Sequence, residues 1–249
     1  MMTVRDSRVA LFWSSTLRRK RLVVSLADIL SSPWETRAVR VQTVNLQHVQ
    51  LIRQSQPAAD AAMAADLVSA DGWPIAFVAR RMGVPCARVT GRDIVDALLT
   101  DPALAGRRVA LLGSRSQVAA SFAELLERNG VTLAHSVHGY AASWDVDELA
   151  ADITGKDCAV VLVAIGAPRG EPLAQALADR LPRGLIVGVG GAVEMATGDM
   201  PGAPAWTGKA GLEWVYRLCH EPRRLGRRYL VESPRALLAL ILILARVGA

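Results

Sequence analysis

The order of apolar and polar residues predicts alternating strands and helices along most of the chain. From residue 106 onward, short apolar runs alternate with segments whose apolar residues recur at helical spacing, which is typical of an α/β protein with a mostly parallel sheet. Residues 158–165 are apolar throughout, as expected for a strand buried on both faces. The predicted strands are 37–44, 66–70, 108–112, 131–137, 158–165 and 184–187, and the predicted helices are 26–30, 46–55, 57–65, 74–81, 90–100, 117–128, 146–153 and 171–180.

The first 36 residues have a weaker pattern. Leu11, Phe12, Trp13 and Leu17 form an amphipathic segment with basic flanks. This segment could be an amphipathic first helix, and we expect a surface helix or a frayed terminus here.

Composition limits the classes of protein to consider. A chain of 249 residues can form one large α/β domain or two small lobes with a real core. A hydrophobic share of 51% excludes a disordered chain, and a net charge of +6 favours polyanions, nucleotides or anionic membrane surfaces as partners. The three cysteines are far apart, which argues against a disulfide framework or zinc site and for a reducing cytoplasm.

Ligands of open parallel sheets bind beyond the carboxyl ends of the strands. Asp71, in the sequence Ala70-Asp71-Gly72, follows a predicted strand and could act as a general base in such a cleft. A helix N-cap explains an aspartate at this position equally well. The residues that follow the predicted strands, and so define the candidate cleft, are Asn45, Asp71, Gly113, Gly139, Gly166 and Gly188.

Two other motifs point away from cofactor chemistry. Gly188-x-Gly190-Gly191 resembles a dinucleotide fingerprint, but Val193 stands where that fingerprint continues, so we expect a tight turn close to a ligand rather than a nicotinamide site. Asp145-x-Asp147 directly precedes a predicted helix, where aspartate caps free N–H groups. The four histidines lack ligand spacing, so we predict no metal site and no cofactor.

A basic stretch at residues 211–230 precedes the C-terminal tail. If its helix continues or resumes past Pro222, Arg217, Arg224 and Arg227 lie within about 80° of one another at about 100° per residue. Three guanidinium groups on one face suit a diphosphate, because each can chelate two oxygens. A solvated basic face is the alternative interpretation.

The tail itself contains ten consecutive apolar residues, 236–245. This run is shorter than the ~20 residues that span a bilayer, so it must bury itself in a partner, in the protein's own body or in a membrane interface. The nearby Arg223 and Arg228 favour an anionic membrane surface. A nucleic-acid interface is not expected, since no aromatic stacking platform is visible.

The motifs taken in order resemble the WecG/TagA/CpsF family, which is glycosyltransferase family 26. The similarity covers roughly residues 38–231, and its last block is the most specific. The motifs are Thr43-x-Asn45, Ala70-Asp71-Gly72, Arg88-Val89-Thr90-Gly91-x-Asp93, Gly139-Tyr140, Gly166-x-Pro168, Gly188-x-Gly190, Ala203-Pro204-x-Trp206 and Gly211-Leu212-Glu213-Trp214-x-Tyr216-Arg217 continuing to Leu230.

This resemblance implies a GT-E fold and an inverting, metal-independent transferase. Its donor would be a UDP-sugar of the N-acetylmannosamine, N-acetylmannosaminuronate or glucose type, and its acceptor a polyprenyl-diphosphate-linked saccharide of cell-surface polysaccharide biosynthesis. The enzyme would be cytoplasmic and peripheral on the inner face of the cell membrane, with no nucleic-acid partner. Homo-oligomerisation stays open.

The resemblance also implies an organisation and a set of site residues. The chain would consist of an N-terminal segment (1–36), a lobe with the catalytic aspartate (37–105), a Rossmann-like nucleotide-binding lobe (106–205) and a basic helical appendage with a membrane-associating tail (206–249). Asp71 would be the base, in a pocket with Arg88, Thr43 and Asn45. The UDP-sugar would be bound by Gly139, Tyr140, Gly166, Pro168, Arg169, Glu171, Gly188, Gly190, Arg217, Arg224 and Arg227.

Three positions depart from the family pattern. Gly170 replaces a usual glutamine, Glu194 a usual aspartate and Gly202 a usual arginine. The changes at Gly170 and Gly202 leave one alternative to a working transferase: an impaired member that only binds nucleotide sugars or partner enzymes. A basic nucleic-acid-binding protein is a separate alternative.

Overall fold

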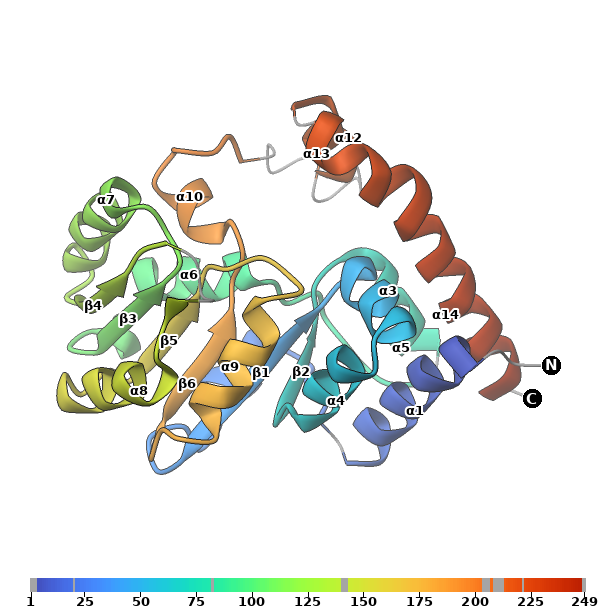
Figure 1. Cartoon of the computed structure of the whole chain (residues 1–249), viewed down its shortest axis with the longest axis horizontal. Coiled ribbons are helices and arrows are strands. Elements are labelled where there is room, and N and C mark those ends of the chain that lie inside the picture. The colour runs from blue at the N-terminus through green and yellow to red at the C-terminus, as the bar shows by residue number, and fades with distance from the viewer. Residues whose placement is uncertain are drawn as a thin grey trace.

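Six parallel strands form one continuous sheet in the order β2-β1-β6-β5-β3-β4 (Figure 1). The computed structural model describes residues 4–19, 21–81, 83–139, 143–202, 207, 213–220 and 222–247. The predicted α/β class with a mostly parallel sheet is confirmed. The strands are β1 (Ala38–Val44), β2 (Leu67–Ala70), β3 (Arg108–Leu112), β4 (Thr132–Val137), β5 (Val160–Val163) and β6 (Gly184–Gly188).

Helices connect the strands close to the predicted positions. Only β5 is clearly shorter than predicted, because its pairing with β3 and β6 covers Val160–Val163. The helices are α1 (Val4–Arg18), α2 (Leu26–Leu30), α3 (Leu46–Gln54), α4 (Gln56–Ala64), α5 (Trp73–Arg81), α6 (Gly91–Thr100), η1 (Pro102–Leu104), α7 (Ser116–Glu127), α8 (Val146–Gly155), α9 (Gly170–Ala178), α10 (Ala192–Ala196), α12 (Glu213–His220), α13 (Pro222–Arg227), η3 (Arg228–Glu232, one π-helical turn) and α14 (Ser233–Val247).

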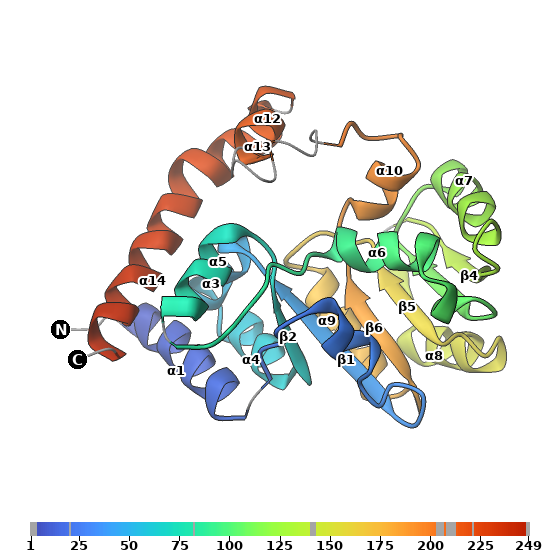
Figure 2. The same cartoon turned by 180° about the vertical axis from the view of Figure 1, so that it is seen from behind.

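The sheet is buried on both faces, which explains the uninterrupted apolar runs of its central strands. Alternate residues of each strand point to opposite faces: Leu111 packs in the cluster with α6, α7 and α10, whereas Leu112 packs in the cluster with α8 and α9. Figures 1 and 2 show these two helical layers from opposite sides. The strands of the two predicted lobes meet in this sheet, since β1 pairs with β6.

A separate core surrounds the carboxyl ends of β1 and β2 and includes the N-terminal helix. Val9, Phe12 and Trp13 of α1 are buried against α3, α4 and α14. The amphipathic helix is present, but the expectation of a frayed terminus is wrong, because the apolar face of α1 is part of a core. The helix lies on the body because its apolar residues at positions i, i+3 and i+4 meet elements that are distant in sequence, which a local pattern cannot reveal.

The C-terminal helix α14 has one face on the protein and one in solvent. Ala236, Ala239 and Leu240 are buried, whereas Leu238 and Ile241 are at least half exposed. The helix runs from α13 to α1 along one side of the molecule (Figure 1). Within the described part of the chain, no helix is both long enough and apolar enough to cross a membrane.

The buried position of α1 gives a stability prediction. Phe12→Ala removes a side chain with 0% exposure, and we expect it to lower the free energy of unfolding by about 3–5 kcal/mol. Leu11→Ala is the control on the same helix, because Leu11 is 51% exposed and should change it by less than about 1 kcal/mol. Urea unfolding measures both; equal small effects would contradict the packing of α1.

Candidate active site

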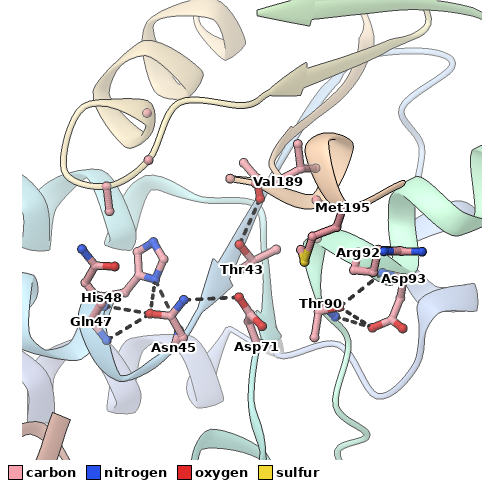
Figure 3. Close-up of a pocket in the computed structure, with 18 of the residues that line it drawn as sticks. Thr43, Asn45, Gln47, His48, Asp71, Thr90, Arg92, Asp93, Val189 and Met195 are labelled. Carbon is pink, nitrogen blue, oxygen red and sulfur yellow. Dashed lines mark hydrogen bonds between the residues drawn. The ribbon is translucent and has the colours of Figure 1, made fainter. Parts of the chain in front are cut away.

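A cleft of about 500 Å³ opens at the carboxyl ends of β1, β2, β5 and β6. Its position follows the rule for open parallel sheets, and its size is typical of small-molecule sites. Of the predicted residues, it brings together Thr43, Asn45, Asp71, Arg88, Gly166, Glu171, Gly188 and Gly190. Figure 3 shows the part of this cleft around Asn45 and Asp71.

Asn45 and Asp71 lie side by side because of strand register. Val44 of β1 is the partner of Ala70 of β2, so the residues that follow them leave the sheet together. The Asp71 N–H donates to the Val44 carbonyl oxygen at 2.9 Å, which extends the ladder by one bond. Gly72 then adopts a φ of +119°, a conformation that suits glycine, and turns the chain into α5.

The amide of Asn45 has a fixed orientation. Asn45 is the N-cap of α3, and its Oδ1 accepts hydrogen bonds from the N–H groups of Gln47 (3.0 Å) and His48 (3.3 Å). Because the oxygen is used on the helix, the NH2 group faces the other way and donates from Nδ2 to Asp71 Oδ2 at 3.3 Å (Figure 3). The helix cap thus directs a donor at the carboxylate.

Asp71 is not at the N-cap position of the next helix. Helix α5 begins at Trp73, so Gly72 occupies the residue before its first turn. The capping explanation of Asp71 that the sequence left open therefore does not match the helix bounds. The carboxylate lines the cleft instead.

Two further contacts fix the rim around Asp71. Arg88 reaches the cleft because an isolated parallel bridge pairs it with Ala70, and the Val89 N–H donates to the Ala70 carbonyl oxygen at 3.0 Å. Thr43 Oγ1 donates to the Gly188 carbonyl oxygen at 3.1 Å and ties the end of β1 to the end of β6.

The opposite wall is the N-terminal turn of α6. Thr90 and Asp93 form a capping box, in which the Thr90 N–H donates to Asp93 Oδ2 at 2.7 Å. A Cβ atom on Gly91 would lie 2.8 Å from the Val189 Cα, so only glycine lets this helix approach the loop after β6 so closely. Arg92 lines the same wall and pairs with Asp96 at 2.6 Å.

His48 is a cleft residue whose role the sequence did not reveal. Its Nε2 lies 2.8 Å from Glu171 Oε1, and both side chains are mostly buried. The only local signal was its position three residues after Asn45, which places it on the capping face of α3. Its partner is 123 residues away in the chain, so no local pattern could join the two.

The charge of Glu171 is held by its neighbours. Burial would raise the pKa of this carboxyl, but the His48 hydrogen bond and charge, together with the charge of Arg40, outweigh burial and lower it. Burial lowers the pKa of Arg40 to about 10 even though Glu171 opposes that shift. Arg40 is 1% exposed, and its Nη1 donates to Gln42 Oε1 at 3.0 Å.

Several predicted site residues lie elsewhere. Gly139 follows β4 at the sheet edge and does not line the cleft, and Pro168 lines a second cavity of about 100 Å³. Arg169 is exposed at the start of α9. Tyr140 and the side chains of Arg217 and Arg224 lie outside the described residues.

The C-terminal appendage reaches the cleft through α13. Leu225 is buried and contributes to the cleft lining. Arg227 is exposed and pairs with Glu232 at 3.3 Å. The helix does resume past Pro222, as the arginine hypothesis required, since α13 begins at that residue.

Gly170 has no room for a side chain in this backbone. A Cβ atom there would lie 2.4 Å from the Ile165 carbonyl oxygen. A glutamine, which the resemblance leads one to expect at this position, would therefore need a shift of the backbone after β5. At Gly202, a Cβ atom would lie 3.9 Å from Arg92 Nη1, so a guanidinium group is already present beside that position.

The Asp145-x-Asp147 motif lies at the start of α8. Asp145 accepts hydrogen bonds from the N–H groups of Asp147 and Glu148, which confirms the predicted helix cap. Among the described residues, no group of three His, Cys, Asp or Glu side chains could hold a metal ion.

Comparison of the sequence with known protein families identifies a matching family. The sequence model of the glycosyl transferase WecG/TagA/CpsF family matches residues 14–247, which is nearly the whole chain. The match includes the strands that form the cleft, the segment with Asp71 and the helical appendage. The chain therefore belongs to the glycosyl transferase WecG/TagA/CpsF family, whose members use a nucleotide-sugar donor and a lipid-linked acceptor to build cell-surface polysaccharides.

Proposed function

We propose that this protein is an inverting, metal-independent glycosyltransferase that acts on a UDP-sugar and a polyprenyl-diphosphate-linked saccharide. The sugar is of the N-acetylmannosamine, N-acetylmannosaminuronate or glucose type. The observation that carries the proposal is the Asp71 carboxylate, which lines the cleft and accepts a hydrogen bond from the capping residue Asn45.

In this mechanism Asp71 acts as the general base. It removes the proton from the acceptor hydroxyl group, and the oxygen forms a bond to the anomeric carbon of the donor. The bond between that carbon and the diphosphate oxygen breaks on the opposite side of the ring, so the configuration inverts and UDP leaves. The Asn45 amide supports the ionised form of Asp71, because a donor favours a charged acceptor.

Cationic side chains take the role of a metal at the leaving group. Negative charge develops on the diphosphate as the bond breaks, and preorganised guanidinium groups stabilise it without proton transfer. Arg88 lines the cleft. The appendage brings Arg217, Arg224 and Arg227 to the diphosphate when the donor binds, and Leu225 marks the place where α13 meets the cleft.

The appendage also holds the enzyme on an anionic membrane surface. Leu238, Ile241 and Leu242 are 48–57% exposed on α14, and Arg235 is exposed on the same helix. Apolar side chains beside arginines suit the interface of an anionic bilayer. Helix α5, which contacts α14 and follows Asp71 directly, adds exposed aromatic residues at Trp73 and Phe77.

A second candidate function is nucleotide-sugar binding without transfer. Gly170 favours it, since the side chain usual in this family is absent and has no room in this backbone. Thermal-shift measurements with the three types of UDP-sugar identify the donor that binds. Tight UDP binding with no transfer to any polyprenyl-diphosphate-linked acceptor would establish this alternative and exclude catalysis.

The role of Asp71 gives the first functional prediction. Asp71→Asn keeps the shape and the contact with Asn45 but removes the base, so we expect turnover to fall by roughly 10²–10⁴-fold while UDP binding persists. Asp60→Asn on the exposed face of α4 makes the same chemical change away from the cleft and should leave turnover unchanged. UDP release in the presence of acceptor measures both, and near-normal turnover of the Asp71 variant would exclude it as the base.

The second prediction concerns the leaving group. Arg224→Ala should reduce turnover by roughly 10²–10³-fold, because it removes a charge from the departing diphosphate. Arg223→Ala is the matched control. Arg223 is next to Arg224 in the chain, but its side chain is exposed and is assigned to the membrane side. Turnover should also survive EDTA; an enzyme that needs Mg²⁺ and is silenced by EDTA would contradict the metal-free mechanism.

The third prediction concerns the membrane surface. Replacing Leu238, Ile241 and Leu242 with glutamine removes roughly 1 kcal/mol of apolar transfer each, so binding to phosphatidylglycerol vesicles should weaken about a hundredfold. Val24→Gln, at an exposed apolar residue before α2, is the control and should bind normally. Vesicle co-sedimentation distinguishes them, and unchanged binding by the triple variant would exclude α14 as the anchor.

A further inference from the structure

A chain of polar contacts extends from Asp71 into the protein behind the cleft. Asp71 accepts from Asn45, the His48 ring lies against Asn45, and the far side of that ring meets Glu171. These residues come from the ends of β1 and β2 and from α3 and α9. Buried polar groups are costly unless they are paired, so such a chain needs a function or a structural reason.

The His48 ring is held at both nitrogens. Nε2 lies 2.8 Å from Glu171 Oε1, and Nδ1 lies 3.3 Å from the Asn45 backbone nitrogen and 3.0 Å from Asn45 Oδ1. In the neutral ring, Nδ1 accepts from the Asn45 N–H and Nε2–H donates to Glu171. In the imidazolium, Nδ1–H donates to Asn45 Oδ1 instead. The ring therefore contacts Asn45 in both forms.

Glu171 is mostly buried and meets His48 through one oxygen. Its Oε2 is buried and has no hydrogen-bond partner among the described residues, and the charge of Arg40 acts on it from β1. Three charged groups surround His48: Glu171 on α9, Arg40 on β1 and, beyond Asn45, Asp71 after β2. Burial restricts the movement of this carboxylate, and its Oε1 lies 2.8 Å from His48 Nε2, so it limits the rotation of the ring that it binds.

We propose that His48 and Glu171 form a positioning pair that holds the Asn45 amide on Asp71. This inference rests on the proposed role of Asp71 as the base. Asn45 touches the base directly, whereas His48 and Glu171 act through Asn45. Without the pair, the bonds to the helix N-terminus still set the general direction of the amide, but the ring no longer lies against it, so the contact with the carboxylate becomes less well defined.

The pair makes a kinetic prediction that simple destabilisation does not. If the Asn45 amide is less well held, the ionised form of Asp71 is less favoured. The acid limb of the kcat/KM profile should therefore move to higher pH by about one unit, which is a tenfold change in the protonation equilibrium. His48→Ala and Glu171→Gln should each produce this shift and lower kcat roughly tenfold, with KM for the UDP-sugar changed less than kcat. The double variant should be no worse than either single variant, because the two residues act as one unit.

Two further variants separate positioning from folding. His48→Gln restores the capping-box bond to the Asn45 N–H, so it should recover thermal stability but not the wild-type acid limb. His138→Ala removes a histidine that follows β4 and does not line the cleft, and it should leave the profile unchanged. In the Asp71→Asn background, His48→Ala should cause no additional loss.

The experiment is therefore a pH–rate series on the full chain, with UDP release measured for the UDP-sugar that supports turnover and with thermal unfolding of every variant. An unmoved acid limb in His48→Ala and Glu171→Gln, additive losses in the double variant, or full recovery by His48→Gln would each overturn the positioning role. An active Asp71→Asn enzyme would instead overturn the proposed base, and the two failures are distinguishable.

Discussion

The site depends on the register between two parallel strands. Val44 is opposite Ala70, so the chain leaves β1 and β2 at the same edge and sets Asn45 beside Asp71. A slip of β2 by one residue would turn its side chains to the other face of the sheet and separate Asp71 from Asn45. Burial of β2 on both faces opposes that slip, since its successive residues Leu67 and Val68 pack against different hydrophobic clusters. Packing along the strand thus fixes the position of the carboxylate.

Sequence patterns predicted the strands, most helices and the cleft, because parallel strands deliver their carboxyl ends to one edge whatever their order. They did not predict the burial of α1, which packs on α3 and α4 and on α14, more than 200 residues later in the chain. The pairing of His48 with Glu171 was hidden for the same reason. Gly170 looked like a lost side chain, and the sequence could not show that a Cβ atom there would lie 2.4 Å from the Ile165 carbonyl oxygen.

The C-terminal helix connects stability to function. Ala236 and Leu240 of α14 complete the core around α1 and α3, while the opposite face leaves leucine and isoleucine side chains in solvent. One helix therefore serves both the fold and the proposed membrane surface, and Leu225 of the preceding helix α13 lines the cleft. Since α5 contacts α14 and begins two residues after Asp71, a bilayer on this side would bring the lipid-linked acceptor close to the base.

A crystal structure of the protein with its UDP-sugar would test the central claim most directly. We predict that the diphosphate lies in the cleft between the end of β1 and the loop after β6. The Asp71 carboxylate should face the anomeric carbon from the side opposite the diphosphate, as attack with inversion requires. UDP bound outside this cleft, or Asp71 on the same side of the sugar as the diphosphate, would contradict the account.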